Sequence, residues 1–333
     1  MTELPTSLAR RLLEIAGIAE RIASVVSIPT GWTNENWLVT LCSGTRLILR
    51  RYRWPHSAAD LDRPVKERYL HRILSAAGVP VARILAHVEE GDLSAALLEF
   101  LPGEPLGDVS TRLSRRDRAD AWRSTGAALR CAHTIQYPPG THGVIVGRRV
   151  RPEAETWGHW MVALLLGHAE RLRDRYEVEL DLARLRRVAE QAVPLLEDHE
   201  PCLLHNDPHV WNVLVDDTGA GWHCSGWLDW EYAWVGDPVW DLTRLDTWRK
   251  RPIGPTPEAF WDGYGAGLVE PNYSLYLMPI CLWQAGDQLM DRSASPTVTR
   301  TRSLAYVADL EHHLAQLEAT VASCESRWHG LSS

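Results

Sequence analysis

The sequence predicts an α+β fold of two lobes, in which an antiparallel sheet precedes a mostly helical part. Three observations lead to this prediction. The chain has 333 residues, which exceeds a typical single domain. Before residue 100, short stretches of β-favouring residues alternate with turns, and beyond it apolar residues recur at helical spacing. We expect an N-terminal lobe over residues 1–100 and a helical C-terminal lobe over residues 101–333.

The N-terminal lobe is expected to contain a hairpin, a helix and two further strands. Residues 36–42 and 45–51 carry β-favouring side chains on both sides of the turn Ser43-Gly44. The amphipathic stretch 64–77 predicts a helix. Gly78 and Pro80 follow it, and strands are expected near residues 83–88 and 94–100.

The C-terminal lobe is expected to be mainly helical, with one hairpin. Val213-Leu214-Val215 and Gly226-Trp227-Leu228 read as strands joined by a turn over residues 216–219. Residues 140–152, rich in Gly, Arg and Pro, predict a loop between helices. Pro194 and Pro279 are expected to break or kink the helices that contain them. By apolar spacing, helices are expected over residues 115–133, 156–175, 180–196, 257–268, 273–291 and 303–324.

The composition limits the class of protein. A net charge of -8 argues against a general nucleic-acid surface, which needs clustered Lys and Arg. The chain has no apolar run of membrane-spanning length and no signal-peptide pattern at its N-terminus, so we expect a cytoplasmic protein without a membrane partner, monomeric or homodimeric. Its six cysteines are scattered without a Cys-x-x-Cys pair, which fits reduced thiols.

The chemistry concentrates in residues 204–215 and 227–230. Asn212 and Asp229 offer the hard oxygen ligands that Mg²⁺ prefers. Asp207, five residues before Asn212, suits a carboxylate that orients or deprotonates an acceptor hydroxyl when the loop curls back. The predicted hairpin would bring Asp229 beside Asn212. The three residues together outline a phosphoryl-transfer centre.

An alternative for the same loop is a transition-metal site. His205, Asp207 and His209 alternate along the chain and would face one way if the loop were extended. Pro208 and the lack of a fourth ligand argue against this interpretation.

The segment Gly236-Asp237-Pro238-Val239-Trp240-Asp241-Leu242 extends the motif. With the His-x-Asp-x-x-x-x-Asn loop and the Asp-Trp pair, it resembles the aminoglycoside phosphotransferase family, whose members are small-molecule kinases with a protein-kinase-like fold. The resemblance implies that Asp207 is the catalytic base and that Asn212 and Asp229 bind the metal. It also implies that Asp241 supports the loop through backbone hydrogen bonds and that His205 is structural.

Two residues depart from the family pattern. Asn206 replaces a Gly, and Asn tolerates a left-handed backbone better than most residues. Trp211 replaces another Gly, and a positive φ there would disfavour Trp. Either the loop differs locally or Trp211 lines a pocket, with hydrophobic packing as the alternative role.

The nucleotide is expected to bind in the N-terminal lobe. In related kinases a strand Lys contacts phosphates and pairs with a helix Glu, and here Arg50 and Glu67 match those places. Arg51 or Arg53 could contact the nucleotide instead of Arg50. By resemblance, a short phosphate loop would include Gly31, Thr33 and Asn34, and the hinge beside the purine would include Glu99 and Leu101.

The acceptor site is expected in the helical lobe. Aromatic side chains bind sugars, bases and cations, and Trp157, Trp160 and Trp283 are candidate pocket walls, although core packing is the alternative for each. Glu231 lies close enough to the centre to contact a cationic acceptor or support the metal. Asp287 and Asp291 could present paired carboxylates to amines, with a solvated helix surface as the alternative.

These expectations combine into one function. The chain would use Mg²⁺ with ATP or GTP to phosphorylate a hydroxyl of a small molecule, by resemblance an antibiotic of the aminoglycoside or nucleoside type, and so confer resistance. A metabolic kinase for an amino alcohol, amino acid or sugar is one alternative. A non-catalytic nucleotide-binding regulator is another, because Arg50 and Trp211 depart from the commonest pattern.

Overall fold

The N-terminal part of the protein is a five-stranded antiparallel sheet. The computed structural model describes residues 5–29, 34–53, 62–247, 254–267, 272–291 and 295–330, with side chains up to residue 319. All neighbouring strands of the sheet are antiparallel. In spatial order they are β1 (Ile22–Ile28), β2 (Asn34–Leu41), β3 (Arg46–Tyr52), β5 (Leu93–Glu99) and β4 (Ile84–Glu90). The expected hairpin and the two later strands are thus confirmed.

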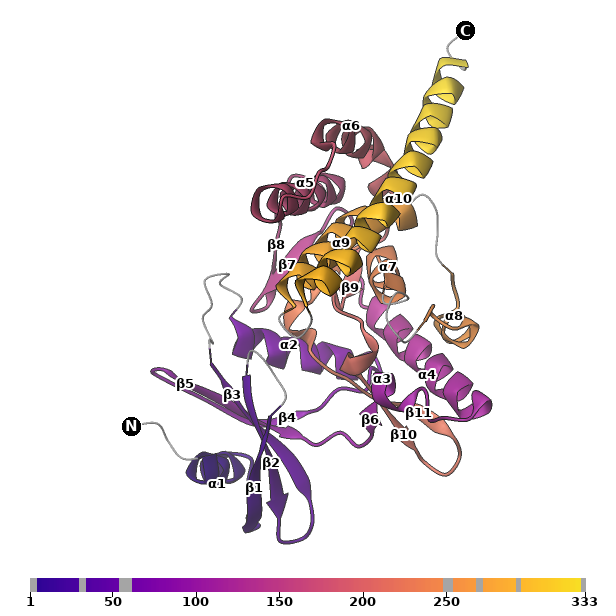
Figure 1. The fold of residues 1–333 in the computed structure, drawn as a ribbon. Helices are drawn as coiled ribbons and strands as arrows, with labels where there is room; N and C mark the ends of the chain where they lie inside the picture. The colour runs from indigo at the N-terminus through magenta and orange to yellow at the C-terminus, as the bar shows by residue number, and fades with distance from the viewer. Residues whose placement is uncertain are drawn as a thin grey trace.

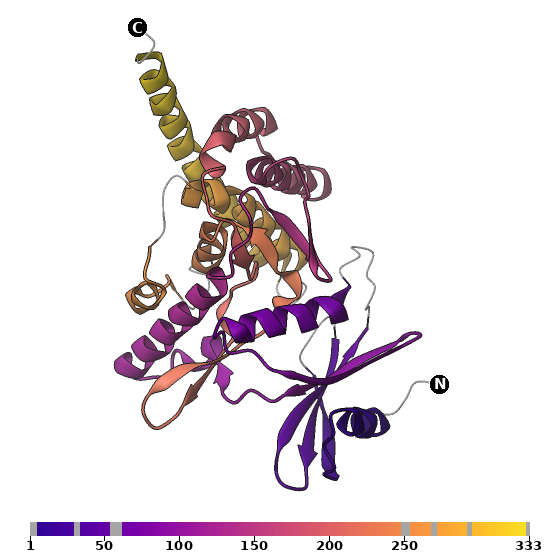
Figure 2. The ribbon, with the colours of Figure 1, turned by 180° about the vertical axis from the view of Figure 1, so that it is seen from behind.

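Two helices accompany this sheet, and they have different roles. Helix α1 (Pro5–Ile15), which the sequence analysis did not predict, packs Leu8 and Leu12 against the sheet. Helix α2 (Arg63–Ala76) instead lies between the sheet and the helical part (Figures 1 and 2). Its buried Leu70 and Leu74 belong to a core cluster that includes Val213. Helix α2 therefore joins the two parts of the molecule.

The remainder of the chain is mostly helical, as predicted. Its termini follow local chemistry: the side chain of Ser114 caps α4, Thr156 caps α5 and Asp181 caps α6, each by accepting a backbone N–H. Among the described residues, no helix is long and apolar enough to cross a membrane. The helices are α3 (Leu106–Val109), α4 (Arg115–His133), α5 (Trp157–Tyr176), α6 (Leu182–Ala192), α7 (Val239–Asp246), α8 (Glu258–Tyr264), α9 (Asn272–Met290) and α10 (Pro296–Gly330).

The two prolines that were expected to disturb helices behave differently. Pro194 ends α6, because the chain tightens into a 3-10 turn over Val193–Leu196. Pro279 lies inside α9, which continues past it. The proline ring therefore breaks one predicted helix and is accommodated by the other.

Two small sheets complete the helical part and position the loop between them. The predicted hairpin is β10 (Val213–Asp217) with β11 (Trp222–Trp227), and β6 (Glu104–Pro105) pairs on the other side of β10. In the second sheet, β12 (Trp234–Gly236) lies between β9 (Cys202–Leu204) and β7 (Gly143–Val146), and β8 (Arg149–Arg151) pairs with β7. The segment 205–212 thus runs from β9 to β10, anchored by both sheets.

The expectation of a loop over residues 140–152 was wrong. This segment forms the β7–β8 hairpin, and Val144 pairs with Trp234 of β12. A partner so distant in sequence gives no local signal. The close approach needs Gly143, where φ is +135° and a Cβ atom would lie 2.0 Å from the carbonyl oxygen of Arg151.

The contact between α4 and α8 yields a stability prediction. A Cβ atom on Gly263 of α8 would lie 1.9 Å from the carbonyl oxygen of Arg123 in α4. We expect Gly263→Ala to lower the free energy of unfolding by about 2 kcal/mol, because the helices must separate. Gly167→Ala is the control, since Gly167 lies in α5 with nothing within 4 Å. It should raise stability by about 1 kcal/mol. Urea unfolding measures both, and equal effects would contradict the prediction.

Candidate active site

The loop between β9 and β10 takes its shape from one buried carboxylate. Asp241 of α7 is fully buried, and its two oxygens accept the backbone N–H groups of His205 (2.6 Å) and Asn206 (2.8 Å). Asn206 adopts the left-handed conformation, with φ of +67°. Its side-chain oxygen accepts the indole N–H of Trp240 at 2.8 Å. The turn that places both amides on one carboxylate thus uses the conformational tolerance of Asn.

His205 ties the loop to the segment after β11. Its Nδ1 accepts the backbone N–H of Asp207 at 3.2 Å, and its Nε2 donates to the carbonyl oxygen of Leu228 at 2.8 Å. Burial lowers the pKa of His205, against the raising effect of nearby carboxylates, so the ring is neutral. Both nitrogens are engaged by backbone groups, which leaves neither for a metal. No group of three or more His, Cys, Asp or Glu side chains arranged to hold a metal occurs among the described residues.

Asp207 forms an ion pair that the sequence analysis did not anticipate. Its Oδ1 accepts a hydrogen bond from Nη2 of Arg244 in α7 at 2.8 Å, and its Oδ2 lies 3.5 Å from Nε2 of His209. Burial would raise the pKa of Asp207, but the Arg244 charge and the two neighbouring histidines lower it overall. The carboxylate is therefore held ionised.

Asn212 and Asp229 lie beside one another because the backbone joins them. The Leu228 N–H donates to the carbonyl oxygen of Asn212 at 2.8 Å, and the Asn212 side-chain nitrogen donates to the carbonyl oxygen of Asp207 at 3.0 Å. The Asn212 amide oxygen remains as a candidate ligand. Burial and the Glu231 charge raise the pKa of Asp229 to about 7, against the lowering effect of Arg50. Oxygen donors in such a setting suit a divalent cation.

Arg50 faces this cluster from β3. Its Nε donates to the Asn36 side-chain oxygen at 3.0 Å, and its Nη1 forms an ion pair with Glu67 of α2. The hydroxyl of Tyr52 donates to the other oxygen of Glu67. Burial would raise the pKa of Glu67, but Arg50 and His71 lower it overall. The strand arginine and the helix glutamate that the sequence paired are thus in contact.

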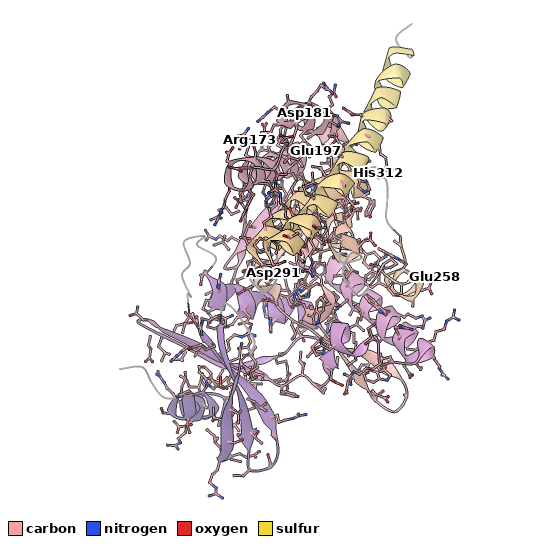
Figure 3. The ribbon with its side chains drawn as sticks, viewed as in Figure 1. Arg173, Asp181, Glu197, Glu258, Asp291 and His312 are labelled. Atoms are coloured by element: carbon pink, nitrogen blue, oxygen red, sulfur yellow. The ribbon has the colours of Figure 1, made fainter. Side chains whose placement is uncertain are left out.

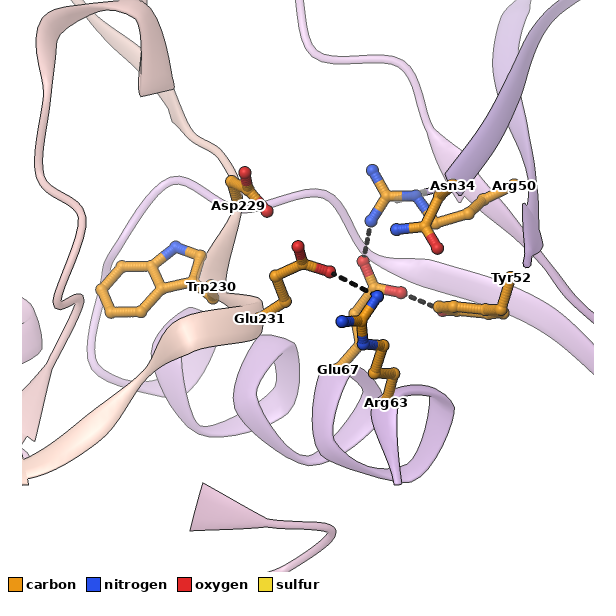
Figure 4. Close-up of a pocket in the computed structure, with 8 residues that line it drawn as sticks. All are labelled: Asn34, Arg50, Tyr52, Arg63, Glu67, Asp229, Trp230 and Glu231. Atoms are coloured by element: carbon orange, nitrogen blue, oxygen red, sulfur yellow. Dashed lines mark hydrogen bonds and ion pairs between the residues drawn. The ribbon is translucent and has the colours of Figure 1, made fainter. Parts of the chain in front are cut away.

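A pocket lies between β3, α2 and the segment after β11 (Figure 4). Figure 4 shows Asp229 and Glu231 on one side of it and the Arg50–Glu67 pair on the other. Gly31 and Thr33 lie outside the described residues. The pocket is lined by Asn34, Arg50, Tyr52, Arg63, Glu67, Asp229, Trp230 and Glu231.

The first turn of α2 holds the segment that carries Asp229. Arg63 lies 3.7 Å from a carboxylate oxygen of Glu231, and Lys66 donates to the carbonyl oxygen of Ala233 at 3.1 Å. Lys66 is 1% exposed. Burial lowers its pKa to about 7, the Glu231 charge raises it, and Arg63 lowers it further. Buried cations thus connect α2 to the candidate active site.

Trp157 and Trp160 are not pocket walls, contrary to the prediction. Trp157 is 1% exposed, and its indole N–H donates to the hydroxyl of Tyr276 at 2.7 Å. Trp160 is 5% exposed and its ring centroid lies 4.4 Å from that of Trp234. Both therefore belong to the core that α5 shares with β12 and α9, because their helix face points inward.

Trp211 packs against α3. Its ring lies against Gly107, where a Cβ atom would come within 2.7 Å, and its indole N–H donates to Asp108 at 2.9 Å. It lies in the 3-10 turn Val210–Asn212 and is not among the described residues with positive φ. The structure therefore favours the packing role, and the loop differs locally from the Gly-containing pattern.

The remaining candidates lie at two other places. Glu99 ends β5 and forms an ion pair with Arg83, and Leu101 follows it and packs near Gly226. Trp283 and Asp287 line a cavity between α5 and α9. The Trp283 ring centroid lies 3.8 Å from Cζ of Arg244, so this cavity borders the ion pair of Asp207.

Sequence reasoning missed Arg244, Arg63 and Lys66. A signal existed for Arg244, because it follows Asp241 by three residues on a helix and so shares the face that meets the loop. For Lys66 the signal was weaker: it is one of two lysines in the chain and precedes Glu67. No feature of the neighbouring sequence indicated that the side chain of Arg244 or Lys66 would be buried.

Comparison with known proteins gives one family match. The model of the phosphotransferase enzyme family matches residues 24–276. No curated protein matches in sequence.

Solved structures of low sequence identity share the fold over nearly the whole chain. A "putative fructosamine-3-kinase" from Thermobifida fusca is 19% identical, with a TM-score of 0.57 over 92% of this chain and 99% of that one. The aminoglycoside phosphotransferase APH(2")-IIa, solved with streptomycin and ATP, is 14% identical, with a TM-score of 0.58 over 95% and 99%. A macrolide 2'-phosphotransferase from Brachybacterium faecium is 17% identical, with 0.53 over 91% and 98%. The predicted kinase-like fold is thereby confirmed.

Lys66 should make stability depend on pH. Its folded pKa of about 7 lies below the unfolded value of about 10.4, so the unfolded chain binds more protons between these values. The stability of the wild type relative to Lys66→Met should therefore rise as pH increases from 7 to 9, by up to about 1.4 kcal/mol per pH unit. Urea unfolding of both proteins at pH 7, 8 and 9 measures this difference. A constant difference would show that Lys66 does not titrate there.

Proposed function

Because the chain belongs to the phosphotransferase enzyme family, we propose that it transfers the γ-phosphoryl group of ATP or GTP to a hydroxyl group of a small molecule. The observation that carries the proposal is the cluster of Asp207, Asn212 and Asp229, which hydrogen bonds hold together. In-line transfer needs an oriented hydroxyl, a metal and a neutralised phosphate chain. Asp207 could orient the hydroxyl, Asn212 and Asp229 could bind the metal, and Arg50 could contact the phosphates.

Asn212 and Asp229 would hold Mg²⁺. The fit rests on the donor set, a carboxamide oxygen and a carboxylate whose pKa is raised by desolvation and then by the Glu231 charge. When bound, Mg²⁺ neutralises charge on the phosphate oxygens. The chain's own contribution is to hold the segments of the two ligands side by side, through the backbone hydrogen bond from Leu228 to Asn212.

Asp207 would orient the acceptor hydroxyl. Its Oδ1 is occupied by Arg244, so Oδ2 is the oxygen that would accept the hydroxyl proton. The acceptor oxygen forms a bond to the γ-phosphorus while the bond from that phosphorus to the bridging oxygen breaks, and the nucleoside diphosphate leaves. The proton passes to Oδ2. Because Arg244 lowers the pKa of Asp207, the carboxylate acts chiefly by positioning.

Arg50 would contact the nucleotide phosphates. Asn36 and Glu67 hold its Nε and Nη1, and Nη2 would be available for phosphate. The planar guanidinium can serve all three partners at once, which an ammonium cannot do in the same geometry. Glu99 and Leu101 would flank the purine at the hinge between the two parts.

Two classes of small molecule are candidates for the acceptor. By resemblance it would be an antibiotic, and the protein would confer resistance. The alternative is a metabolic kinase, and one observation favours it: the cavity beside Trp283 is lined by Arg171 and Arg175, whose charges disfavour a polycation such as an aminoglycoside. Nucleotide consumption measured with panels of both compound classes distinguishes them.

A non-catalytic nucleotide-binding regulator would also use the pocket between β3, α2 and the segment after β11. The intact set of Asp207, Asn212 and Asp229 argues against that role, because nucleotide binding alone does not need a base oriented toward an acceptor. Preserved nucleotide binding without metal-dependent phosphate transfer to any acceptor would favour it.

The role of Asp207 can be tested by substitution. We expect Asp207→Asn to lower kcat by about 10²- to 10⁴-fold, because the amide cannot accept the hydroxyl proton. Nucleotide affinity should remain within about threefold, since the phosphate contacts are elsewhere. Asp262→Asn, at an exposed position of α8, is the control. Near-native turnover of the Asp207 variant would refute the mechanism.

Arg50→Lys tests the nucleotide site. A lysine cannot bind Asn36, Glu67 and a phosphate together, so we expect about tenfold weaker binding of ATP or GTP. Arg51→Lys tests the alternative: Arg51 pairs with Glu35, and its substitution should leave nucleotide affinity unchanged. Titration with a fluorescent nucleotide measures both variants. Weaker binding only in the Arg51 variant would reassign the phosphate contact.

A further inference from the structure

A cavity of about 130 Å³ lies between α5 and α9. Its lining residues recur along one face of each helix, so the two faces meet across it. Trp283 is half-buried and Met290 is 52% exposed, which gives the cavity an apolar side open to solvent. The residues used below are His168, Arg171, Arg175, Trp283, Asp287 and Met290.

Two side chains in contact, Trp283 and Arg244, connect this cavity to the candidate catalytic carboxylate. Arg244 donates to Asp207 at 2.8 Å, and its Cζ lies 3.8 Å from the ring centroid of Trp283. The ring of His168 lies parallel to that of Trp283, with centroids 6.0 Å apart. A small molecule against Trp283 would therefore lie close to the acceptor position at Asp207.

The charges around the cavity are mainly positive, although the whole chain has a net charge of -8. Arg171 and Arg175 line it, and Asp287 is the carboxylate in the lining. Burial, followed by the charges of Arg171 and Arg244, lowers the pKa of His168 to about 4. The imidazole is therefore neutral at neutral pH, in a positive field.

Arg244 adds a buried positive charge behind Trp283, outside the lining of the cavity. It is 3% exposed, and its Nε and Nη1 are buried without a hydrogen-bond partner in the described part of the chain. Buried donors are normally hydrogen-bonded, and the charge of this guanidinium adds to the positive field at His168. A carboxylate or phosphate suits the planar edge of a guanidinium.

We propose that the acceptor is a small hydroxylated compound with a carboxylate or phosphate group beside an apolar or flat portion. Arg171 and Arg175 bind the anionic group, the buried charge of Arg244 attracts it through space, and Trp283 contacts the apolar portion. The anion thereby orients the hydroxyl toward Oδ2 of Asp207. This inference rests on the proposed phosphotransferase function and narrows its acceptor class.

Matched pairs of compounds test the proposal. The carboxylate pairs are D-gluconate against D-glucose and 3-phenyllactate against its amide, the phosphate pair is glycerol 3-phosphate against glycerol, and kanamycin serves as the polycation. Mass spectrometry detects one added phosphate, and calorimetry on the full chain with a non-hydrolysable ATP analogue and Mg²⁺ measures binding. We expect the anionic member of at least one pair to exceed its partner tenfold in kcat/KM or affinity. Comparing the carboxylate pairs with the phosphate pair shows which anionic group the protein prefers.

Variants on one helix provide the matched control. Arg171→Gln and Arg175→Gln should each raise KM or Kd for the preferred anion about tenfold and leave the partner compound unaffected. Arg173→Gln should change neither. Arg173 lies on α5 (Figure 3), is not among the residues that line the cavity, and pairs with Asp174.

Two outcomes overturn the inference. One is that the protein phosphorylates or binds a neutral compound or kanamycin at least as well as it does every anionic compound. The other is an equal effect of the Arg173 and Arg171 substitutions. Failure of the proposed function itself is distinguishable, because neither the anionic compounds, nor their partners, nor kanamycin would then gain a phosphate, whether or not calorimetry shows nucleotide binding.

Discussion

The carboxylate of Asp241 is the constraint on which the candidate site depends. It is fully buried and accepts the backbone N–H groups of His205 and Asn206, which fixes the turn that precedes Asp207. A buried carboxylate without such donors would be costly, and two backbone amides without an acceptor would be costly as well. The loop and α7 therefore stabilise each other, and the same helix carries Arg244 to Asp207.

A second constraint is the attachment of α2 to the loop segment after β11. Lys66 and Arg63 bring two buried cations to Ala233 and Glu231, while the next residue, Glu67, binds Arg50 of the sheet. One helix thus contacts the strand arginine on one side and the segment of the candidate metal ligand Asp229 on the other. Its placement between the sheet and the helical part (Figure 1) connects the candidate nucleotide pocket to the candidate catalytic loop.

Much of the fold could be predicted because its signals are local. The β2–β3 hairpin, α2 and the β10–β11 hairpin each carry their own turn and periodicity. The left-handed backbone at Asn206 is consistent with the sequence, because Asn tolerates that conformation better than most residues. The β7–β8 hairpin could not be predicted, because its pairing with β12 joins distant segments. Helical spacing also could not tell whether Trp157 lines a pocket or fills the core.

By itself, the sequence determined the family and the kinase-like fold. The types and spacing of Asp207, Asn212 and Asp229, with the segment from Gly236 to Leu242, predict oxygen ligands and a base. Only the tertiary structure decided what surrounds them. Arg244 meets Asp207, and Arg171 meets Trp283 across a cavity, because particular faces of α5, α7 and α9 are packed together. The charge of a pocket depends on which helix faces meet, and spacing along one chain does not specify that.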